Sequence, residues 1–349
     1  MSGDVILQAT DLVKHYPIKT GIIKRTTGYV RAVDGVSFDL RAGETLGVVG
    51  ESGCGKSTLG RLLMRLEEPT SGSVMFEGVD MYKQSGNAMR RLRRDIQIVF
   101  QDPYTSLDPR KTVADIIGEP FDVFPDAAPK GSRSQRVREL LDLVGLNPEH
   151  INRYPHQFSG GQRQRICVAR GIALHPKVLI CDEPVSALDV SVQAQVVNLL
   201  EYLQDELGLA YVFIAHDLAV VRHISDRVAV MYLGKIVESG DEPQIYEHPT
   251  HPYTQALLSA VPVPDPKLKD TREQIVLVGD VPSPANPPSG CRFHTRCWLR
   301  RDADGQAICA AEEPVLKVQA DGATSHQCAC HFAGAHDPVA DRMPVDATE

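Results

Sequence analysis

The sequence predicts an α/β fold in which a mostly parallel sheet is covered on both faces. Short apolar runs alternate with longer segments of helical periodicity, an order that is typical of such sheets. The expected strands are Thr45–Val49, Ile96–Phe100, Val178–Cys181 and Tyr211–Ile214. The expected helices are Lys56–Leu66, Arg136–Val144, Gly161–Leu174 and Val192–Leu207. Because ligands of parallel sheets bind at the carboxyl ends of the strands, the polar residues that follow each strand are the candidates for chemistry.

The composition is that of a soluble globular chain. It has 349 residues, of which 42% are hydrophobic and 23% charged. At roughly 150 residues per domain, this length predicts two domains. The longest apolar run, Leu209–Ala215, is far shorter than the roughly 20 residues that cross a bilayer. No Lys or Arg precedes Lys14, so the N-terminus does not resemble a secretory signal. We therefore expect a cytosolic chain without a membrane span of its own.

The charge balance argues against a general nucleic-acid binder. The formal net charge is −8, whereas binding to a phosphate backbone requires a positive surface. The basic run Met89-Arg-Arg-Leu-Arg-Arg94 is interpreted as the solvated face of a helix. No nucleic acid is therefore expected as a partner.

The first candidate site is a glycine-rich loop between an expected strand and an expected helix. It reads Gly50-Glu-Ser-Gly-Cys-Gly-Lys-Ser57. The glycines let backbone N–H groups and the helix N-terminus face a phosphate, Lys56 reaches the β- and γ-phosphates, and the Ser57 hydroxyl binds Mg²⁺. Cys54 contributes only backbone, so no redox role is assigned to it. The expected nucleotide contacts are Ser52, Gly53, Cys54, Gly55, Lys56, Ser57 and Thr58. The sequence therefore predicts a nucleotide site.

Two carboxylates and a histidine follow the next expected strands. Asp182 and Glu183 come directly after the apolar run Val178–Cys181, and His216 follows the run that ends at Ala215. Asp182 is expected to hold Mg²⁺, and Glu183 is placed to polarise an attacking water. His216 is expected to contact the γ-phosphate and to orient Glu183 and the water. With the phosphate loop upstream, these residues predict nucleotide hydrolysis.

A second anion site at a helix N-terminus distinguishes this chain from other phosphate-loop proteins. Ser159, Gly160, Gly161 and Gln162 open the expected helix Gly161–Leu174, and one subunit does not need two such sites for one nucleotide. At this point the chain resembles the nucleotide-binding subunits of ATP-binding cassette (ABC) transporters. The resemblance implies a RecA-like core with a helical subdomain at about 103–170 and an antiparallel β subdomain.

The same resemblance assigns further residues. In this family the Ser-Gly-Gly-Gln signature closes over the ATP of a partner subunit, and Phe158 replaces the leucine that usually precedes it. Tyr16 matches the aromatic residue that stacks on adenine. Gln101 matches the glutamine that senses Mg²⁺ and the membrane subunit. The loop that crosses the dimer interface is matched by Ser186, Ala187, Leu188 and Asp189.

The cysteines are concentrated near the C-terminus. Cys54, Cys167 and Cys181 precede residue 290, and the window 291–330 holds the other five. In a cytosolic protein such a cluster favours a metal site over disulfides. The segment Pro282–Pro288 contains four prolines and indicates an ordered loop or linker. The predicted division is an ATPase domain at 1–240 and a C-terminal extension at 241–349.

The resemblance narrows to the oligopeptide and dipeptide importer ATPases, most closely to the F-type oligopeptide subunit. The matching segments are Gln101–Arg110, Asn152–Phe158, His251–Leu257 and Pro288–Cys297. In this subfamily four cysteines of the extension are implied to hold a [4Fe–4S] cluster, and the matching positions are Cys291, Cys297, Cys309 and Cys330. Zinc and unliganded structural thiols stay open as alternatives, as does Cys328 in place of Cys330.

The resemblance implies the ATP-hydrolysing motor of a peptide importer, peripheral on the cytoplasmic face of the inner membrane. Its implied partners are a second, D-type ATPase forming a heterodimer, two transmembrane permeases and an extracytoplasmic peptide-binding protein. The alternative is a soluble ABC ATPase acting on nucleic acid or ribosomes. The single uninterrupted cassette, the acidic charge and the tail favour the importer. Peptides are the expected substrate, and nickel complexes or other small solutes are the alternatives.

Overall fold

The computed structural model describes residues 4–21, 24–129, 131–261, 274–301, 303–319 and 325–333. The strands of this part are β1 (Val5–Thr20), β2 (Arg25–Arg41), β3 (Thr45–Val49), β4 (Ser71–Phe76), β5 (Val79–Asp80), β6 (Ile96–Val99), β7 (Val178–Asp182), β8 (Ala210–Ile214), β9 (Arg227–Tyr232), β10 (Lys235–Asp241), β11 (Lys317–Val318) and β12 (Gln327–Cys328). The α-helices are α1 (Lys56–Leu63), α2 (Gly86–Asp95), α3 (Pro103–Ser106), α4 (Val113–Val123), α5 (Arg133–Leu143), α6 (Gly160–Ile172), α7 (Val190–Leu207), α8 (Leu218–Ile224), α9 (Glu242–Glu247), α10 (Pro252–Ser259) and α11 (Ala303–Ala311). Short 3₁₀ turns are η1 (Met81–Lys83), η2 (Pro125–Ala127), η3 (Pro148–Asn152), η4 (Pro155–Gln157) and η5 (Trp298–Arg301).

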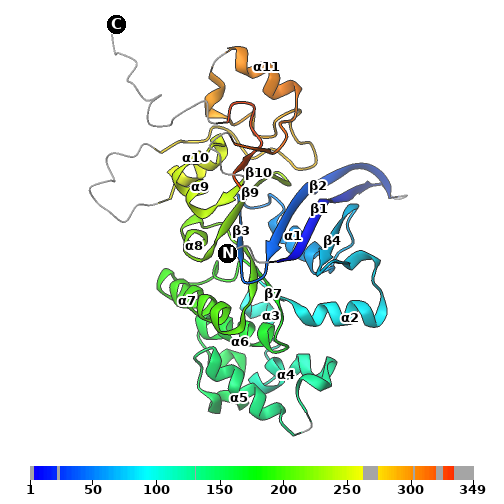
Figure 1. Ribbon diagram of the computed structural model, residues 1–349, viewed down its shortest axis with the longest axis vertical. Helices are drawn as coiled ribbons and strands as arrows, with labels where there is room; N and C mark the ends of the chain where they lie inside the picture. Colours follow the sequence, from blue (N-terminus) through cyan, green and yellow to red (C-terminus); the bar gives the residue numbers. More distant parts are fainter. Residues whose placement is uncertain are drawn as a thin grey trace, which may run out of the picture.

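The centre of the described structure is a large mixed sheet with the strand order β11-β12-β10-β9-β3-β8-β7-β6 (Figure 1). The neighbours from β9 to β6 are parallel, as the pairings of β3 with β8 and of β7 with β6 and β8 demonstrate. β10 and β12 continue the sheet antiparallel. The predicted mostly parallel sheet is confirmed, with antiparallel strands added at one edge.

Alternating side chains of the central strands enter two separate cores. On β7, Leu179 and Cys181 pack into the core shared with helices α4 to α8. Val178 and Ile180 point to the other face, into the core shared with α1 and the antiparallel strands β1, β2 and β4. Because side chains of a strand alternate between faces, strands that are apolar at every position must be covered on both sides. The predicted coverage is confirmed, and on one face a second sheet supplies most of it.

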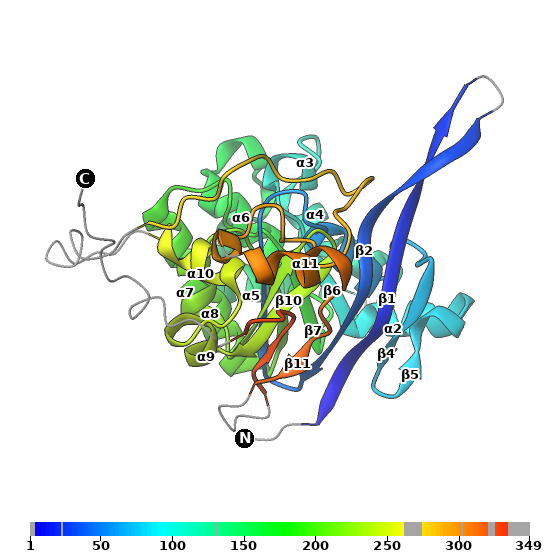
Figure 2. The same ribbon diagram turned by 90° about the horizontal axis from the view of Figure 1, so that it is seen from above.

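That second sheet has the order β2-β1-β4-β5 and is the antiparallel β subdomain that the family resemblance implied. Strands β1 and β2 form a long hairpin that runs beside the molecule and extends beyond it (Figure 2). Shorter β4 pairs with β1 on the other side. The hairpin carries Tyr16 on β1, so it places one expected nucleotide contact next to the central sheet.

A helical layer and the C-terminal extension lie at opposite ends of the long axis (Figure 1). The helical layer contains α4, α5 and α6; α4 and α5 lie within the range of about 103–170 expected for a helical subdomain, and α6 ends two residues beyond it. The extension is joined to the central sheet, because β12 pairs with β10 and the Ala329 N–H donates to the Val237 carbonyl at 2.8 Å. The division at residue 240 remains a prediction, since the sheet continues across it.

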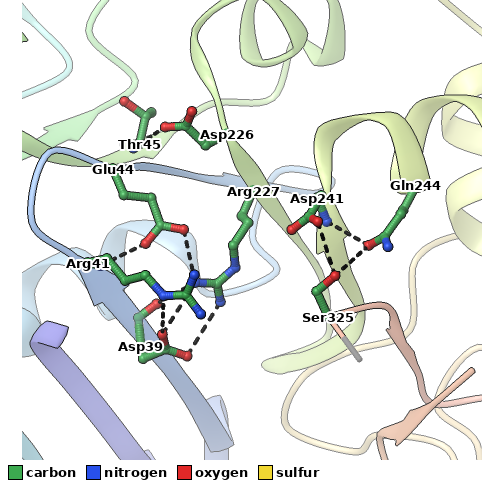
Figure 3. Close-up of polar contacts among 9 residues, drawn as sticks. All are labelled: Asp39, Arg41, Glu44, Thr45, Asp226, Arg227, Asp241, Gln244 and Ser325. Carbon is green, nitrogen blue, oxygen red and sulfur yellow. Dashed lines mark hydrogen bonds and ion pairs between the residues drawn. The ribbon is translucent and has the colours of Figure 1, made fainter. Parts of the chain in front are cut away.

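Polar contacts join the second sheet and the extension to the central sheet at the amino ends of its parallel strands (Figure 3). Arg227 at the start of β9 contacts Asp39 on β2 and Glu44 before β3, at 3.4 and 3.0 Å. The Ser325 hydroxyl of the extension donates to Asp241 at 3.1 Å and lies 3.2 Å from the side-chain oxygen of Gln244. These contacts occupy the amino ends, whereas ligands of parallel sheets bind at the carboxyl ends, so we expect the site at the opposite ends of the same strands.

Candidate functional site

The phosphate loop connects β3 to α1, as its sequence predicts. Gly55 has a φ of 109°, and a Cβ there would lie 1.9 Å from the Ala32 carbonyl oxygen, so only glycine fits this position. The buried Lys56 side chain lies inside the curve of the loop, where its Nζ donates to the carbonyls of Gly50 and Glu51 at 2.7 and 3.1 Å. The loop therefore surrounds one cation at the N-terminus of a helix, an arrangement suited to phosphate.

The acid pair lies at the carboxyl end of β7, beside this loop. The Ser57 hydroxyl donates to Asp182 at 2.9 Å. Burial raises the pKa of the Asp182 carboxyl, the Glu183 charge adds to the rise, and the hydrogen bond from Ser57 opposes it. A bound divalent cation would reverse this balance by stabilising the ionised form. Hydroxyl and carboxylate oxygens are ligands that Mg²⁺ prefers, so Ser57 and Asp182 fit a magnesium site.

Glu183 is the centre of a group assembled from three neighbouring strands and the phosphate loop. The Gln101 amide, after β6, donates to its Oε2 at 2.6 Å. His216 Nδ1, after β8, lies 3.5 Å from Oε2, and Lys56 Nζ lies 4.0 Å from Oε1. Glu183 itself has a φ of 48°, which is uncommon for a residue other than glycine. Its carboxylate is thus held among one amide, one imidazole and one cation, the surroundings of a base that orients water.

Tyr16 lies beside α1 on the β1 strand. Its hydroxyl donates to Glu67, and the Lys14 ammonium lies 5.0 Å from the ring centroid. Burial, followed by the contact with Glu67, raises the pKa of the phenol. The structure therefore places a half-buried aromatic ring near the helix that begins at the phosphate loop, and its stacking on a base stays a prediction.

Ser159 caps the N-terminus of α6. The Gln162 N–H donates to its hydroxyl at 3.3 Å, and the Gln162 amide oxygen accepts from the Ser159 N–H at 3.0 Å. Ser159 and Gln162 are exposed. The two glycines between them make room for neighbours, since a Cβ on Gly161 would lie 2.3 Å from Val192 Cγ1. The second anion site thus faces outward.

The loop Ser186–Asp189 links this second anion site to the acid pair. At its start, the N–H and hydroxyl of Ser186 donate to the Glu183 carbonyl at 3.3 and 3.1 Å. At its end, Asp189 occupies the N-cap position of α7 without a capping hydrogen bond from its side chain, and Leu188 lies next to Gly160, where a Cβ would be 3.3 Å from Leu188 Cδ2. A displacement of this loop would therefore affect both places.

The four cysteines expected to bind a cluster line one cavity. Cys291, Cys297, Cys309 and Cys330 share it with His251 and Phe293, whereas Cys328 lies on β12. None of the four forms a disulfide, and burial raises the pKa of Cys291 to about 11 and that of Cys330 to about 12. Within the described ranges, however, no three His, Cys, Asp or Glu side chains are grouped so that they could hold a metal ion. The geometry brings the thiols together without forming a metal-binding group.

The contacts that join the extension to the phosphate loop and to β2 were not predicted from the sequence. Arg296 forms two hydrogen bonds with the carboxylate of Glu51 in the phosphate loop, and the Tyr253 hydroxyl accepts from the Glu51 N–H. Arg292 binds Asp34, whose other carboxylate oxygen accepts from His15 next to Tyr16. The only signal in the sequence is that both arginines directly adjoin cysteines of the cluster, Cys291 and Cys297.

Residues 33–186 match the family described as ABC transporter, and residues 237–303 match the family described as oligopeptide/dipeptide transporter, C-terminal region. The oligopeptide transport ATP-binding protein AppF of Bacillus subtilis is 54% identical, over 94% of this chain and 98% of that protein. The dipeptide transport ATP-binding protein DppF of Escherichia coli is 57% identical, over 84% of this chain and 87% of that protein. The oligopeptide transport ATP-binding protein OppF of Salmonella typhimurium is 51% identical, over 93% of this chain and 96% of that protein.

Solved structures share the fold. The dimeric ATP-binding cassette MJ0796 in a post-hydrolysis state with ADP and Pi has a TM-score of 0.60 and is 28% identical, covering 68% of this chain and 99% of that chain. CbiO1 of Clostridium perfringens, part of the cbiONQ transporter complex, has a TM-score of 0.59 at 29% identity, covering 70% of this chain and 92% of that chain.

Among the described residues, no helix combines the length and apolar character needed to cross a membrane.

Proposed function

The chain belongs to the family of ATP-binding subunits of oligopeptide and dipeptide ABC transporters, and we propose from this membership how its residues perform the work. It is an ABC ATPase that couples ATP hydrolysis to peptide transport. The observation that carries the residue assignments is the convergence of Gln101, His216 and Lys56 on the Glu183 carboxylate, beside the hydrogen bond between Ser57 and Asp182.

The phosphate loop and α1 bind the triphosphate. Backbone N–H groups from Ser52 to Thr58 face the phosphates, and Lys56 exchanges its contacts with loop carbonyls for phosphate oxygens. Ser57 and Asp182, with Gln101, would hold Mg²⁺, which would neutralise phosphate charge when bound. Tyr16 stacks on the adenine ring. Since stacking uses the π-face of a base, its contribution is about 1–3 kcal/mol and discriminates weakly between ATP and GTP.

Glu183 is the general base. Its carboxylate orients the attacking water and accepts a proton from it, while Gln101 and His216 fix the direction of the carboxylate. His216 also contacts the γ-phosphate. These contacts hold the base in place before reaction, so less reorganisation is needed in the transition state.

The exposed Ser159–Gln162 segment serves the nucleotide of a partner ATPase, which we propose to be a D-type subunit in a heterodimer. Its helix N-terminus donates to the γ-phosphate across the interface, and the loop Ser186–Asp189 relays the state of one site to the other. Two transmembrane permeases and an extracytoplasmic peptide-binding protein complete the importer. This chain is then peripheral, on the cytoplasmic face of the inner membrane, and Gln101 with the exposed Tyr104 faces the permeases.

Reconstitution tests this function. The full chain, its partner ATPase and both permeases are incorporated into liposomes, and uptake of labelled dipeptides and oligopeptides is measured with the binding protein present. ATP-dependent uptake that disappears with Lys56→Ala is expected. Stimulation of hydrolysis by RNA or ribosomes, with no response to peptide, would contradict the proposal and favour the soluble ATPase. Uptake of nickel complexes alone would change the substrate; the relatives named above are named for peptide transport.

For the extension we propose a [4Fe–4S] cluster on Cys291, Cys297, Cys309 and Cys330. What supports it is that these four thiols line one cavity and form no disulfide. Anaerobically purified protein is expected to contain iron and acid-labile sulfide in equal amounts. One tightly bound zinc without iron would favour the zinc alternative. Protein that contains neither metal would overturn both and leave the thiols as packing residues.

A further inference from the structure

Two residues of the C-terminal extension form hydrogen bonds with Glu51 of the phosphate loop. Arg296 Nη1 and Nη2 donate to the two carboxylate oxygens of Glu51 at 2.7 and 3.1 Å. The Tyr253 hydroxyl, from α10, accepts from the Glu51 N–H at 2.9 Å. Arg296 and Tyr253 lie 245 and 202 residues from Glu51 in sequence, so only the fold brings them together.

Every polar group of Glu51 is engaged by these contacts and by Lys56. The N–H is bound by Tyr253, the carboxylate by Arg296, and the carbonyl accepts from Lys56 Nζ at 3.1 Å. Glu51 therefore contacts protein groups behind the loop, while the loop residues that follow it face the phosphate. The carboxylate is one-quarter exposed and the Arg296 side chain is 8% exposed, so the ion pair is partly shielded from water.

Both groups that hold Glu51 are themselves held rigidly. The Tyr253 ring is completely buried between Tyr232 and Phe293, with ring centroids 4.7 and 5.4 Å away. Arg296 follows Phe293 by three residues, and its N–H donates to the Phe293 carbonyl at 2.9 Å. Glu51 is thus fixed to an aromatic cluster that combines β9, α10 and the extension.

We propose that Tyr253 and Arg296 are positioning residues that fix Glu51 and thereby the conformation of the phosphate loop, so that the ATP affinity of this chain depends on its C-terminal extension. The proposal rests on the proposed function of the phosphate loop as the ATP site.

The expected consequence is a change in binding. The loop contains Gly50, Gly53 and Gly55, all at positive φ, and such glycines have many alternative conformations to lose. Holding Glu51 removes part of this freedom before ATP arrives. Because the loop contacts phosphate in the ground state and the transition state alike, its loosening raises KM more than it lowers kcat.

Two variants of the full-length chain test the proposal, Tyr253→Phe and Arg296→Gln. Tyr253→Phe removes only the hydroxyl and keeps the aromatic packing. The Kd for a fluorescent Mg-ATP analogue is measured by titration, and KM and kcat in the assembled complex. Ser325→Ala is the matched control, since it removes another contact of the extension at the opposite ends of the parallel strands (Figure 3).

Each of the two variants is expected to raise Kd and KM about tenfold, with kcat within threefold of wild type, while Ser325→Ala leaves Kd unchanged. Glu51→Gln combined with Arg296→Gln is expected to be no worse than either alone, because both remove one interaction. Arg296→Lys, which keeps the charge, is expected to recover part of the affinity. Folded Tyr253→Phe and Arg296→Gln chains with wild-type Kd would overturn the proposal. A wild-type chain that binds no Mg-ATP would instead overturn the proposed function.

Discussion

Replacement of Glu238 by Gln is expected to release the extension from the central sheet. The Glu238 carboxylate is fully buried and contacts Thr250 N–H and hydroxyl at 2.6 and 2.7 Å, His251 N–H at 3.1 Å and His326 Nε2 at 2.9 Å. These contacts hold the pKa of Glu238 below its usual value despite burial. The Gln side chain has lost the negative charge. In either orientation of its amide, the NH₂ group faces a backbone N–H donor, of Thr250 or of His251. Removing one partner of such a buried group costs about 3 kcal/mol, toward the lower end of measured values.

Hydrogen exchange reports this loss where it occurs. Peptides covering β12 include the Ala329 N–H, which donates to Val237 in β10. A cost of about 3 kcal/mol predicts exchange faster by roughly two orders of magnitude there, with little change in the α4–α6 layer. Glu313→Gln is the control, because the ion pair of Glu313 with Lys235 is exposed and is worth about 0–1 kcal/mol. Exchange within threefold of wild type in Glu238→Gln would refute the reasoning.

Three further outcomes are expected. Ser159→Arg should leave the chain's own Mg-ATP binding intact, by titration, but abolish turnover of the partner's nucleotide in the complex; loss of binding by the isolated chain would place the signature in its own site. Cys297→Ser should remove the iron–sulfur absorbance of anaerobically purified protein and lower the thermal midpoint, and an unchanged iron content would contradict the ligand set. Burial lowers the pKa of His251 to about 4. Between pH 6.5 and 4, His251 is protonated in the unfolded chain but neutral in the folded chain. The free energy of unfolding in urea should therefore decrease as pH falls through this range, by up to about 1.4 kcal/mol per pH unit from this group. A urea midpoint that does not depend on pH would contradict this expectation.

The central strands and their site residues were predictable from sequence for local reasons. β3 matches its expected range, and β7 and β8 each differ by one residue, because all three strands are buried and consist almost entirely of apolar residues. Since chemistry gathers at the carboxyl ends of parallel strands, Asp182 and His216 could be placed in advance. The same logic failed for Phe100, which was expected in a strand but lies beyond β6 and is 37% exposed.

Elements with mixed patterns were not predictable in this way. Strands β1 and β2 pair with several register shifts, so their apolar positions do not alternate regularly. Helix α4 begins with a capping box of Thr112 and Asp115, a start signal that lies in the sequence but does not show in its hydrophobic periodicity. The hydrogen bonds of Arg296 and Tyr253 with Glu51 join segments more than 200 residues apart, and no local sequence pattern predicts such contacts.

The proposed role of Glu183 as general base is tested by the substitution Glu183→Gln. The change keeps the shape of the side chain and its contact with Gln101 but removes the proton acceptor. ATP turnover and Mg-ATP binding are measured side by side in the reconstituted complex. Hydrolysis is expected to fall by about 10²–10⁴ while binding is retained, so that the ATPase subunits stay closed on ATP. Turnover near the wild-type rate would contradict it.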